Sequence, residues 1–312
     1  MQTEKGALRL SATAALLVGT IAIGFSFATD SQAILLDGLF NVTYFLTALL
    51  TLKVAELVAK PDDEEYPFGY AYFEPLINGV KGVLLLGISM LALLDSVDAL
   101  FEGGRMIVVG PAIGYGVFAT AVCTTAAVLL HRAHRKTGSP LVGADAANWM
   151  VNGAISGAVL LTFATIPLVE AAGWSAVTPY VDPLAVTIVV LISLGVPIRI
   201  AWDALKAMLN RAPPATFRTP VVVTIEAALA DLPAERVFVR MLRPGRTLYV
   251  VVHVVLPETW TVGGLTTLDT VRARVDAAVQ ERHGPAVVDV VFTADARWAA
   301  PAAPGMAARR DD

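Results

Sequence analysis

Charged residues are scarce in this chain. Asp, Glu, Lys and Arg make up 16% of its 312 residues, whereas a soluble domain carries about 25%. Hydrophobic residues make up 56% of the chain, and the mean hydropathy is +0.65. This balance excludes a disordered chain, a fibrous repeat and a highly soluble enzyme. It favours a chain that keeps much of its length in lipid.

Cysteine and excess positive charge are lacking too. The one cysteine, Cys123, lies inside an apolar run, so the chain can form neither an internal disulfide nor a zinc site of several thiolates. The formal net charge of -4 gives the chain no general basic character. Nucleic acid is therefore not an expected partner.

Long apolar runs fill the first two thirds of the sequence. A helix that spans a bilayer needs about 20 mostly apolar residues, and six segments meet this requirement. They are Leu8–Phe27, Ala33–Val58, Phe73–Phe101, Ile107–Leu130, Val142–Val169 and Pro183–Met208. Lys5 and Arg9 before the first run also fit a signal peptide. No small-residue cleavage site follows cleanly and further spans come after it, so we predict that the first helix is retained.

The charges of the predicted loops indicate an orientation. Basic residues crowd the loop after the fourth span (131–136), and Lys60, Arg211 and Arg218 follow the second and sixth spans. The loops on the other side carry almost no Lys or Arg. By the positive-inside rule both termini are cytoplasmic. We expect a multi-pass protein of the inner cell membrane.

A different pattern begins near Asn210, where Pro213 and Pro214 mark a linker. The pattern then predicts a helix, two strands, a helix and a strand, at Val221–Leu232, Val237–Leu242, Thr247–Leu256, Gly264–His283 and Ala286–Thr293. This order is typical of a small ferredoxin-like α+β domain with its helices on one face of a sheet. The predicted division is 1–210 for a transmembrane bundle of six helices, 211–298 for a cytoplasmic dimerisation domain and 299–312 for a disordered tail.

Polar side chains inside the spans mark the candidate site. Asp37 and Asn41 are four residues apart in the second span, and Asn148 and Asn152 are four apart in the fifth. Residues at this spacing share one face of a helix. Two facing stripes would place four oxygen donors around one point, which suits a hard cation. The alternative is that the Asn residues only form hydrogen bonds between helices.

Several stretches around these positions form a characteristic set. They are LLDGLFN (Leu35–Asn41), PDDEEYPFGYAYFEPL (Pro61–Leu76), GADAANWMVNGAIS (Gly143–Ser156) and the pair Asp182-Pro183. In these stretches the chain resembles the cation diffusion facilitator (CDF) family of membrane transporters over nearly its whole length. The resemblance implies six spans, a cytoplasmic domain that dimerises, and cation efflux by alternating access in exchange for protons.

The chain departs from that family at the site itself. Members that move zinc carry two Asp in the second helix, and a His and an Asp in the fifth. Those positions here read Asp37, Asn41, Asn148 and Asn152. Because only Asp37 keeps a carboxylate, the resemblance implies an atypical, oxygen-only site with Asp37 as the metal ligand. Tyr66 and Tyr70 stand where the family's loop carries His, so the accessory loop metal site is expected to be absent, and Glu74 is expected to fix the end of the third helix.

Two further charged residues are candidate accessory groups. Lys81 lies about 14 Å into the third span, where its amine is expected to pair with Asp37 or another polar group. It is either a built-in cation that competes with the cargo or a lysine that reaches a watery vestibule. Asp145 precedes Asn148 by one turn and is expected to draw cations toward the site. In the soluble domain His253 is isolated, and Phe292 stands at the expected position of a second His, so we expect dimerisation without metal.

These observations predict a homodimeric transporter of inorganic cations in the lipid bilayer, with no tightly bound cofactor. The expected cargo is a divalent metal such as manganese, magnesium, iron or zinc, or a monovalent cation, and any proton coupling would use Asp37. Harder ions are favoured because neutral amides are poor zinc ligands. The alternative is a non-transporting or regulatory family member that acts as a dimer partner. An enzyme is not expected, because the spans contain no nucleophile–base pair, phosphate loop or His cluster.

Overall fold

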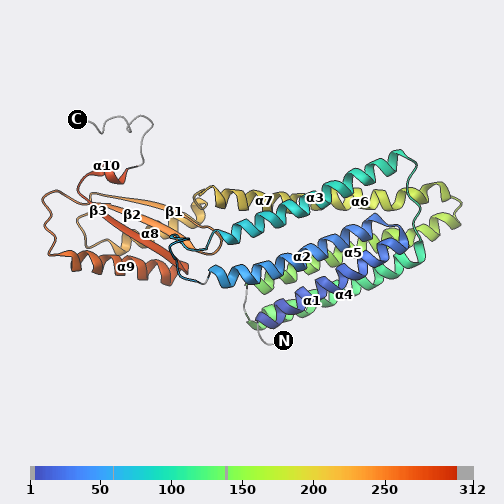
Figure 1. Ribbon diagram of the computed structural model, residues 1–312, viewed down its shortest axis with the longest axis horizontal. Helices are drawn as coiled ribbons and strands as arrows, with labels where there is room; N and C mark the ends of the chain where they lie inside the picture. Colours follow the sequence, from blue (N-terminus) through green and yellow to red (C-terminus); the bar gives the residue numbers. More distant parts are fainter. Residues whose placement is uncertain (1–3, 59, 138–139, 301–312) are drawn as a thin grey trace. The chain divides into compact units, whose positions relative to one another are not determined.

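The computed structural model describes residues 4–58, 60–137 and 140–300, which form two compact units. The helical unit comprises Met1–Glu56 and Ile77–Trp202, and the mixed unit comprises Leu57–Leu76 and Asp203–Asp312. The long helices are α1 (Glu4–Thr29), α2 (Gln32–Val58), α3 (Phe73–Phe101), α4 (Val109–Thr137) and α5 (Pro140–Ala171), followed by η1 (Ser175–Tyr180), α6 (Val181–Ser193) and α7 (Gly195–Met208) (Figure 1). Within these described ranges, six spans are long and apolar enough to cross a membrane, as predicted.

The sixth span differs from the single helix that was predicted. It begins earlier, at Ser175, and a turn at Leu194 divides it into α6 and α7. Pro197 has no N–H with which to bond the carbonyl of Ser193, and Gly195 weakens the helix at the same place. These two residues explain why the apolar run forms two helices in succession.

The fourth span corrects a second expectation. The basic residues 131–136 were placed in a loop, but α4 continues to Thr137. They therefore occupy the last turns of a helix, where positive charge is favourable beside the helix C-terminus. Side chains on one face of this helix end are consequently held at fixed spacing.

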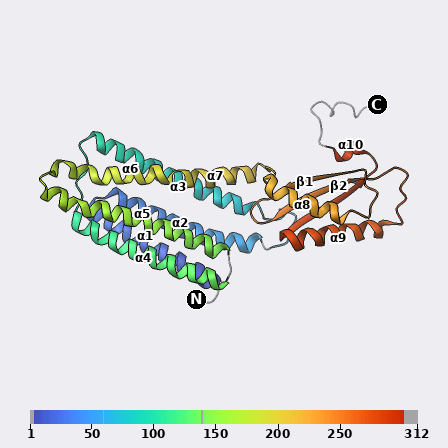
Figure 2. The same ribbon diagram turned by 180° about the vertical axis from the view of Figure 1, so that it is seen from behind.

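Small residues allow the helices to approach closely. A methyl group added at Gly38 of α2 would lie 3.0 Å from the Cβ of Ala22 in α1, and one added at Gly82 of α3 would lie 2.6 Å from the backbone nitrogen of Ala201 in α7. Figures 1 and 2 show α3 alongside α6 and α7 from both sides. Close packing of this kind holds helices together where lipid removes the hydrophobic driving force.

Asp182 joins the sixth span to the start of α2. Its fully buried carboxylate accepts hydrogen bonds from the Ser31 hydroxyl at 2.5 Å and from the backbone N–H of Gln32 at 3.0 Å. An anion at a helix N-terminus satisfies free N–H groups and interacts favourably with the helix dipole. Asp182 therefore has a structural role at the start of α2.

The mixed unit contains a sheet covered by helices on one face. Its elements are α8 (Ala215–Ala228), β1 (Arg236–Leu242), β2 (Leu248–Val255), α9 (Leu265–His283), β3 (Ala286–Thr293) and α10 (Ala296–Ala299). The strand order is β1-β2-β3, with β1 antiparallel and β3 parallel to β2. Apolar side chains of α8 and α9 pack on alternate strand residues such as Val250 and Val252. The predicted α+β order is thus confirmed.

The ends of this unit differ from the sequence-based expectation. Helix α8 begins at Ala215, directly after Pro214 and inside the stretch that was read as a linker, and it continues through Pro220. Pro220 has no N–H with which to bond the carbonyl of Thr216. The expected disordered tail begins at residue 299, and its residues 301–312 lie outside the described part of the chain.

Candidate cation site

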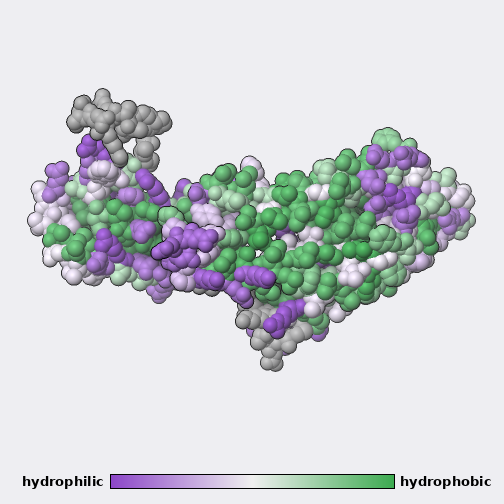
Figure 3. Space-filling view, in the orientation of Figure 1, coloured by the Kyte–Doolittle hydropathy of each residue, from purple (hydrophilic) through white to green (hydrophobic). Residues whose placement is uncertain are grey.

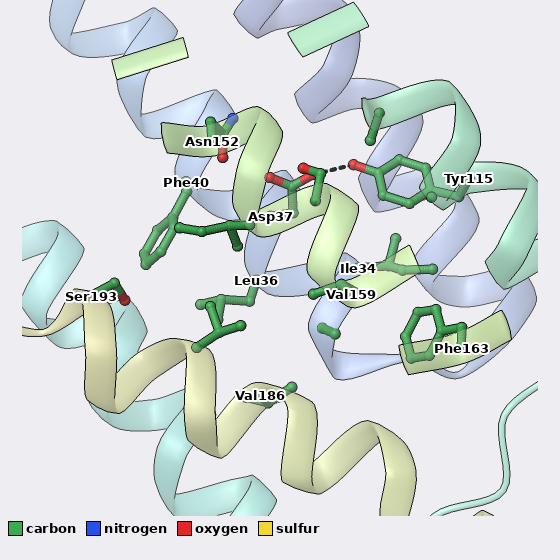
Figure 4. Close-up of a pocket in the computed structure, with 16 residues that line it drawn as sticks. Ile34, Leu36, Asp37, Phe40, Tyr115, Asn152, Val159, Phe163, Val186 and Ser193 are labelled. Carbon is green, nitrogen blue, oxygen red and sulfur yellow. Dashed lines mark hydrogen bonds between the residues drawn. The ribbon is translucent and has the colours of Figure 1, made fainter. Parts of the chain in front are cut away.

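A cavity of about 60 Å³ lies inside the helical unit, between α2, α4, α5 and α6. Most of its lining is apolar, and its polar residues are Asp37, Tyr115, Asn152, Ser156 and Ser193. Figure 4 shows Asp37 and Tyr115 pointing toward one another, with Asn152 beside them. Since one water needs about 10–15 Å³ by this measure, the cavity has room for one ion and a few waters.

Both oxygens of the Asp37 carboxylate are engaged by neutral donors. The Asn41 amide nitrogen donates to Oδ1 at 2.9 Å, and to the backbone carbonyl of Asp37 at 2.8 Å. The Tyr115 hydroxyl of α4 donates to Oδ2. Asn41 is almost fully buried, with 2% of its surface exposed. Asp37 is the only carboxylate among the residues that line the cavity, and no cationic side chain lies in that lining.

The two Asn residues of α5 are placed differently from each other. Asn152 lines the cavity, and its amide nitrogen lies 3.6 Å from the sulfur of Cys123. Asn148 is exposed and is not part of the cavity wall. In this arrangement the structure brings Asp37, Asn41 and Asn152 together and leaves Asn148 outside.

Tyr115 is the residue of this site that the sequence did not single out. Its ring is 4% exposed and packs near Phe25 and Phe118, with centroids 5.9 Å and 6.3 Å away. An aromatic residue within an apolar helix is normally a core residue. Only the contact with Asp37 distinguishes it, and that contact joins residues 78 positions apart.

Lys81 is paired at a second place in the helical unit. Its Nζ lies 4.1 Å from the centroid of the Tyr44 ring, and it interacts electrostatically with Asp145. Asp145 is in turn hydrogen-bonded to Ser11, whose hydroxyl accepts from the Trp149 indole at 2.8 Å. Lys81 therefore interacts with the Tyr44 ring and with Asp145. Asp37 is not one of its partners.

The loop before α3 is held by hydrogen bonds of its own. Asp63 accepts from the backbone N–H of Tyr66 at 2.8 Å and from the Tyr70 hydroxyl at 2.5 Å. The bond from Tyr70 lowers the pKa of Asp63, and the same bond raises the pKa of Tyr70 to about 12. The rings of Tyr66 and Tyr70 contact each other in a tilted arrangement, with centroids 4.6 Å apart. These tyrosines thus order the loop as a small aromatic cluster.

Glu74 anchors this loop to the turn between β1 and β2. Its carboxylate accepts from the Arg246 backbone N–H at 2.8 Å and from Nε at 2.5 Å. Gly245 in that turn has φ 60°, and a Cβ there would lie 2.0 Å from Oε2 of Glu74. The contact therefore requires glycine for space as well as for conformation. Glu74 fixes the start of α3, which agrees with the role expected from the sequence.

His253 lies on the sheet face opposite α8 and α9. Its cross-strand neighbours are Phe238 and Val291, so Phe292, expected beside it, is one residue out of register and on the other face. Burial, followed by the charge of Arg240, lowers the pKa of His253. Across residues 4–58, 60–137 and 140–300, no three His, Cys, Asp or Glu side chains converge in a way that would hold a metal.

Comparison with known proteins identifies the family. Residues 8–209 match the model of the cation efflux transmembrane domain, which is more than half of the chain. The chain belongs to the cation efflux family. It is therefore a multi-pass membrane transporter of cations, and the resemblance to the CDF family is confirmed. The family consists of transporters and not of enzymes.

Named relatives agree with the family. An uncharacterized transporter of Synechocystis is 24% identical over 261 residues, which cover 81% of this chain and 79% of the relative. The cation-efflux pump FieF of Salmonella paratyphi A is 27% identical over 213 residues, which cover 68% of this chain and 67% of the pump. The FieF sequence of Salmonella newport matches to the same extent.

Proposed function

We propose that the protein exports a hard divalent cation, such as manganese or magnesium, through the Asp37 cavity. The observation that carries this proposal is a single carboxylate in the cavity wall with only neutral partners, Asn41 and Tyr115. A cation that binds there meets carboxylate, amide and hydroxyl oxygens. Such donors suit manganese and magnesium better than zinc, which prefers imidazole and thiolate.

Alternating access with proton exchange is the mechanism that we propose. Asp37 is the titratable carboxylate of the cavity, so a proton and a cation would compete for the same oxygens. Binding of the cation displaces the donated hydrogen bonds of Asn41 and Tyr115, and these bonds re-form when the cation leaves. The division of the sixth span at Leu194, beside the lining residue Ser193, provides a place where that helix can bend.

Transport by reconstituted full-length protein tests the proposal. Vesicles are loaded in turn with manganese, magnesium, iron, zinc and a monovalent cation, and flux is followed with and without a pH gradient. We expect manganese or magnesium to move fastest. We also expect export from the side of the membrane that carries the termini to be faster when the opposite side is more acidic. Fastest movement of zinc would contradict the proposed oxygen-only site.

The same hydrogen bonds give a specific reason to retain the alternative function. Because protein donors occupy both Asp37 oxygens, a state without cargo is already satisfied, as in a family member that no longer transports. Such a protein would act as a dimer partner or regulator. This regulatory function would be favoured if the protein is folded in the vesicles and moves none of the cations in the panel.

We also propose that the protein is a homodimer of the inner membrane with both termini in the cytoplasm. The sheet face that carries Phe238 and His253 offers apolar residues, and Val287 and Val291 on β3 are 47% and 40% exposed. A second copy would cover this face without a metal ligand. Cross-linking of the full-length protein should therefore give the same dimer fraction with and without a chelator, and loss of the dimer on chelation would contradict this proposal.

A further inference from the structure

A second hollow lies on the helical unit, away from Asp37, between α4 and α5. It measures about 500 Å³ and is open at the surface. At one end its wall carries the nitrogen-bearing side chains of His131, Arg132 and Arg135, and further along it carries apolar residues such as Val128 and Ala154. The hollow thus has a basic end and an apolar end.

Within the described residues, no ion pair neutralises the two arginines of the basic end. Helix α4 contains no Asp or Glu along its whole length. In the described part of the chain, neither Arg132 nor Arg135 takes part in a recorded ion pair or hydrogen bond. Each guanidinium offers several N–H donors in a planar fork that matches a phosphate group. The positive charge and the donors are therefore available to an external anion.

The apolar end runs along the membrane-spanning part of α4. Val128, Arg132 and Arg135 lie on neighbouring turns of one face, and the lining extends from Thr124 to Arg135. The eleven helical steps from Thr124 to Arg135 measure about 16 Å, about half of a hydrocarbon core roughly 30 Å thick. The whole hollow is thus about as long as one leaflet, with its basic residues in the turns nearest the end of α4 and its apolar residues deeper in the span.

We propose that this hollow binds one anionic phospholipid. Its phosphate lies on Arg132 and Arg135 with His131 beside it, and one acyl chain follows Val128 and Ala154 between the helices. Charge complementarity selects an anionic headgroup, as in other basic pockets between spanning helices. The apolar half selects a lipid over free phosphate, which would occupy only the basic end. This proposal does not depend on the identity of the transported cation.

Lipid binding to the purified full-length protein tests the proposal. Native mass spectrometry in detergent compares phosphatidylglycerol with phosphatidylcholine of the same acyl chains. The test variant is R132Q/R135Q, and the matched control is K53Q/K136Q. The control removes the same charge at exposed positions outside the lining. We expect phosphatidylglycerol to bind about tenfold more weakly to the test variant, and binding of phosphatidylcholine and of the control to remain unchanged.

A second variant tests the apolar half while all charges are kept. Ala154 is exposed, so Ala154→Phe fills the hollow from the surface without disturbing the core. We expect it to weaken binding of phosphatidylglycerol several-fold, and we expect excess inorganic phosphate not to displace the lipid. Displacement by phosphate, or an Ala154→Phe variant that binds normally, would assign a free-anion site and overturn the proposal. An equal loss of phosphatidylglycerol binding in R132Q/R135Q and K53Q/K136Q would overturn it as well. So would cross-links that place a second copy of the chain over the hollow.

Discussion

Asp37 and Asp145 are two carboxylates within the spans of one helical unit, and they differ in the charge beside them. Asp37 receives hydrogen bonds from an amide and a phenol, whereas Asp145 is hydrogen-bonded to Ser11 and also interacts electrostatically with Lys81. A carboxylate with neutral donors keeps its net charge for an incoming cation. The ammonium group of Lys81 partly offsets the charge of Asp145. Under the function that we propose, Asp37 binds the cargo and Asp145 has a structural or guiding role.

Removal of each carboxylate should separate the two roles most clearly. Asp37→Asn should lower cation flux roughly a hundredfold, because loss of a charge–charge interaction worth about 3 kcal/mol corresponds to two orders of magnitude. Asp145→Asn is the matched control and should keep flux within several-fold of the unchanged protein. Initial rates in vesicles, normalised to inserted protein, measure both. Equal losses in the two variants would remove the distinction.

Restoration of the family's usual ligands should change the preferred cation. The triple variant N41D/N148H/N152D adds two carboxylates and an imidazole, which are good zinc ligands. We expect zinc flux to rise about tenfold or more relative to manganese. Because Asn148 is exposed in this structure, a gain in zinc flux also requires that α5 bring this position toward Asp37 in another state. The variant N41D/N152D, without the histidine, serves as the control for added charge alone.

The pairing of Lys81 with Asp145 should appear in stability. Lys81→Met and Asp145→Asn should each lower the free energy of unfolding by about 2 kcal/mol, because each leaves one intramembrane charge unpaired. The double variant should lose about 1 kcal/mol less than the sum of the single losses. Thermal unfolding of the unchanged protein, the two single variants and the double variant in detergent measures these losses. Strict additivity would show that the two charges do not interact.

The smallest expected effect concerns the phenol at Asp37. Tyr115→Phe removes one donor from the carboxylate, so a cation no longer has to displace it. A net hydrogen bond of about 1 kcal/mol corresponds to a half-saturating cation concentration about three- to fivefold lower. Concentration dependence of flux measures this change. A higher half-saturating concentration would instead make the Tyr115 oxygen a cation ligand.

The sequence predicted what depends on spacing within one helix. Asp37 and Asn41 were expected on one stripe, and the hydrogen bond between them agrees with that spacing. Spacing does not give the rotation of one helix against another, so it could not show that Asn152 enters the cavity wall and Asn148 does not. Nor could it reveal the contacts of Tyr115 and Asp182, whose partners are 78 and 151 residues away. The partner of Lys81 was left open for the same reason.

The loop 57–76 belongs to the mixed unit, and this has a consequence for fragment design. The backbone passes from one unit to the other at three peptide bonds, after Glu56, Leu76 and Trp202. A single cut near residue 210 releases the sheet but removes two contacts of the loop. Glu74 loses its contact with Arg246. The Phe68 carbonyl loses the hydrogen bond that the Tyr249 hydroxyl donates to it at 2.6 Å. A fragment that keeps the whole mixed unit must carry residues 57–76 as a graft, joined to the C-terminal segment by a linker.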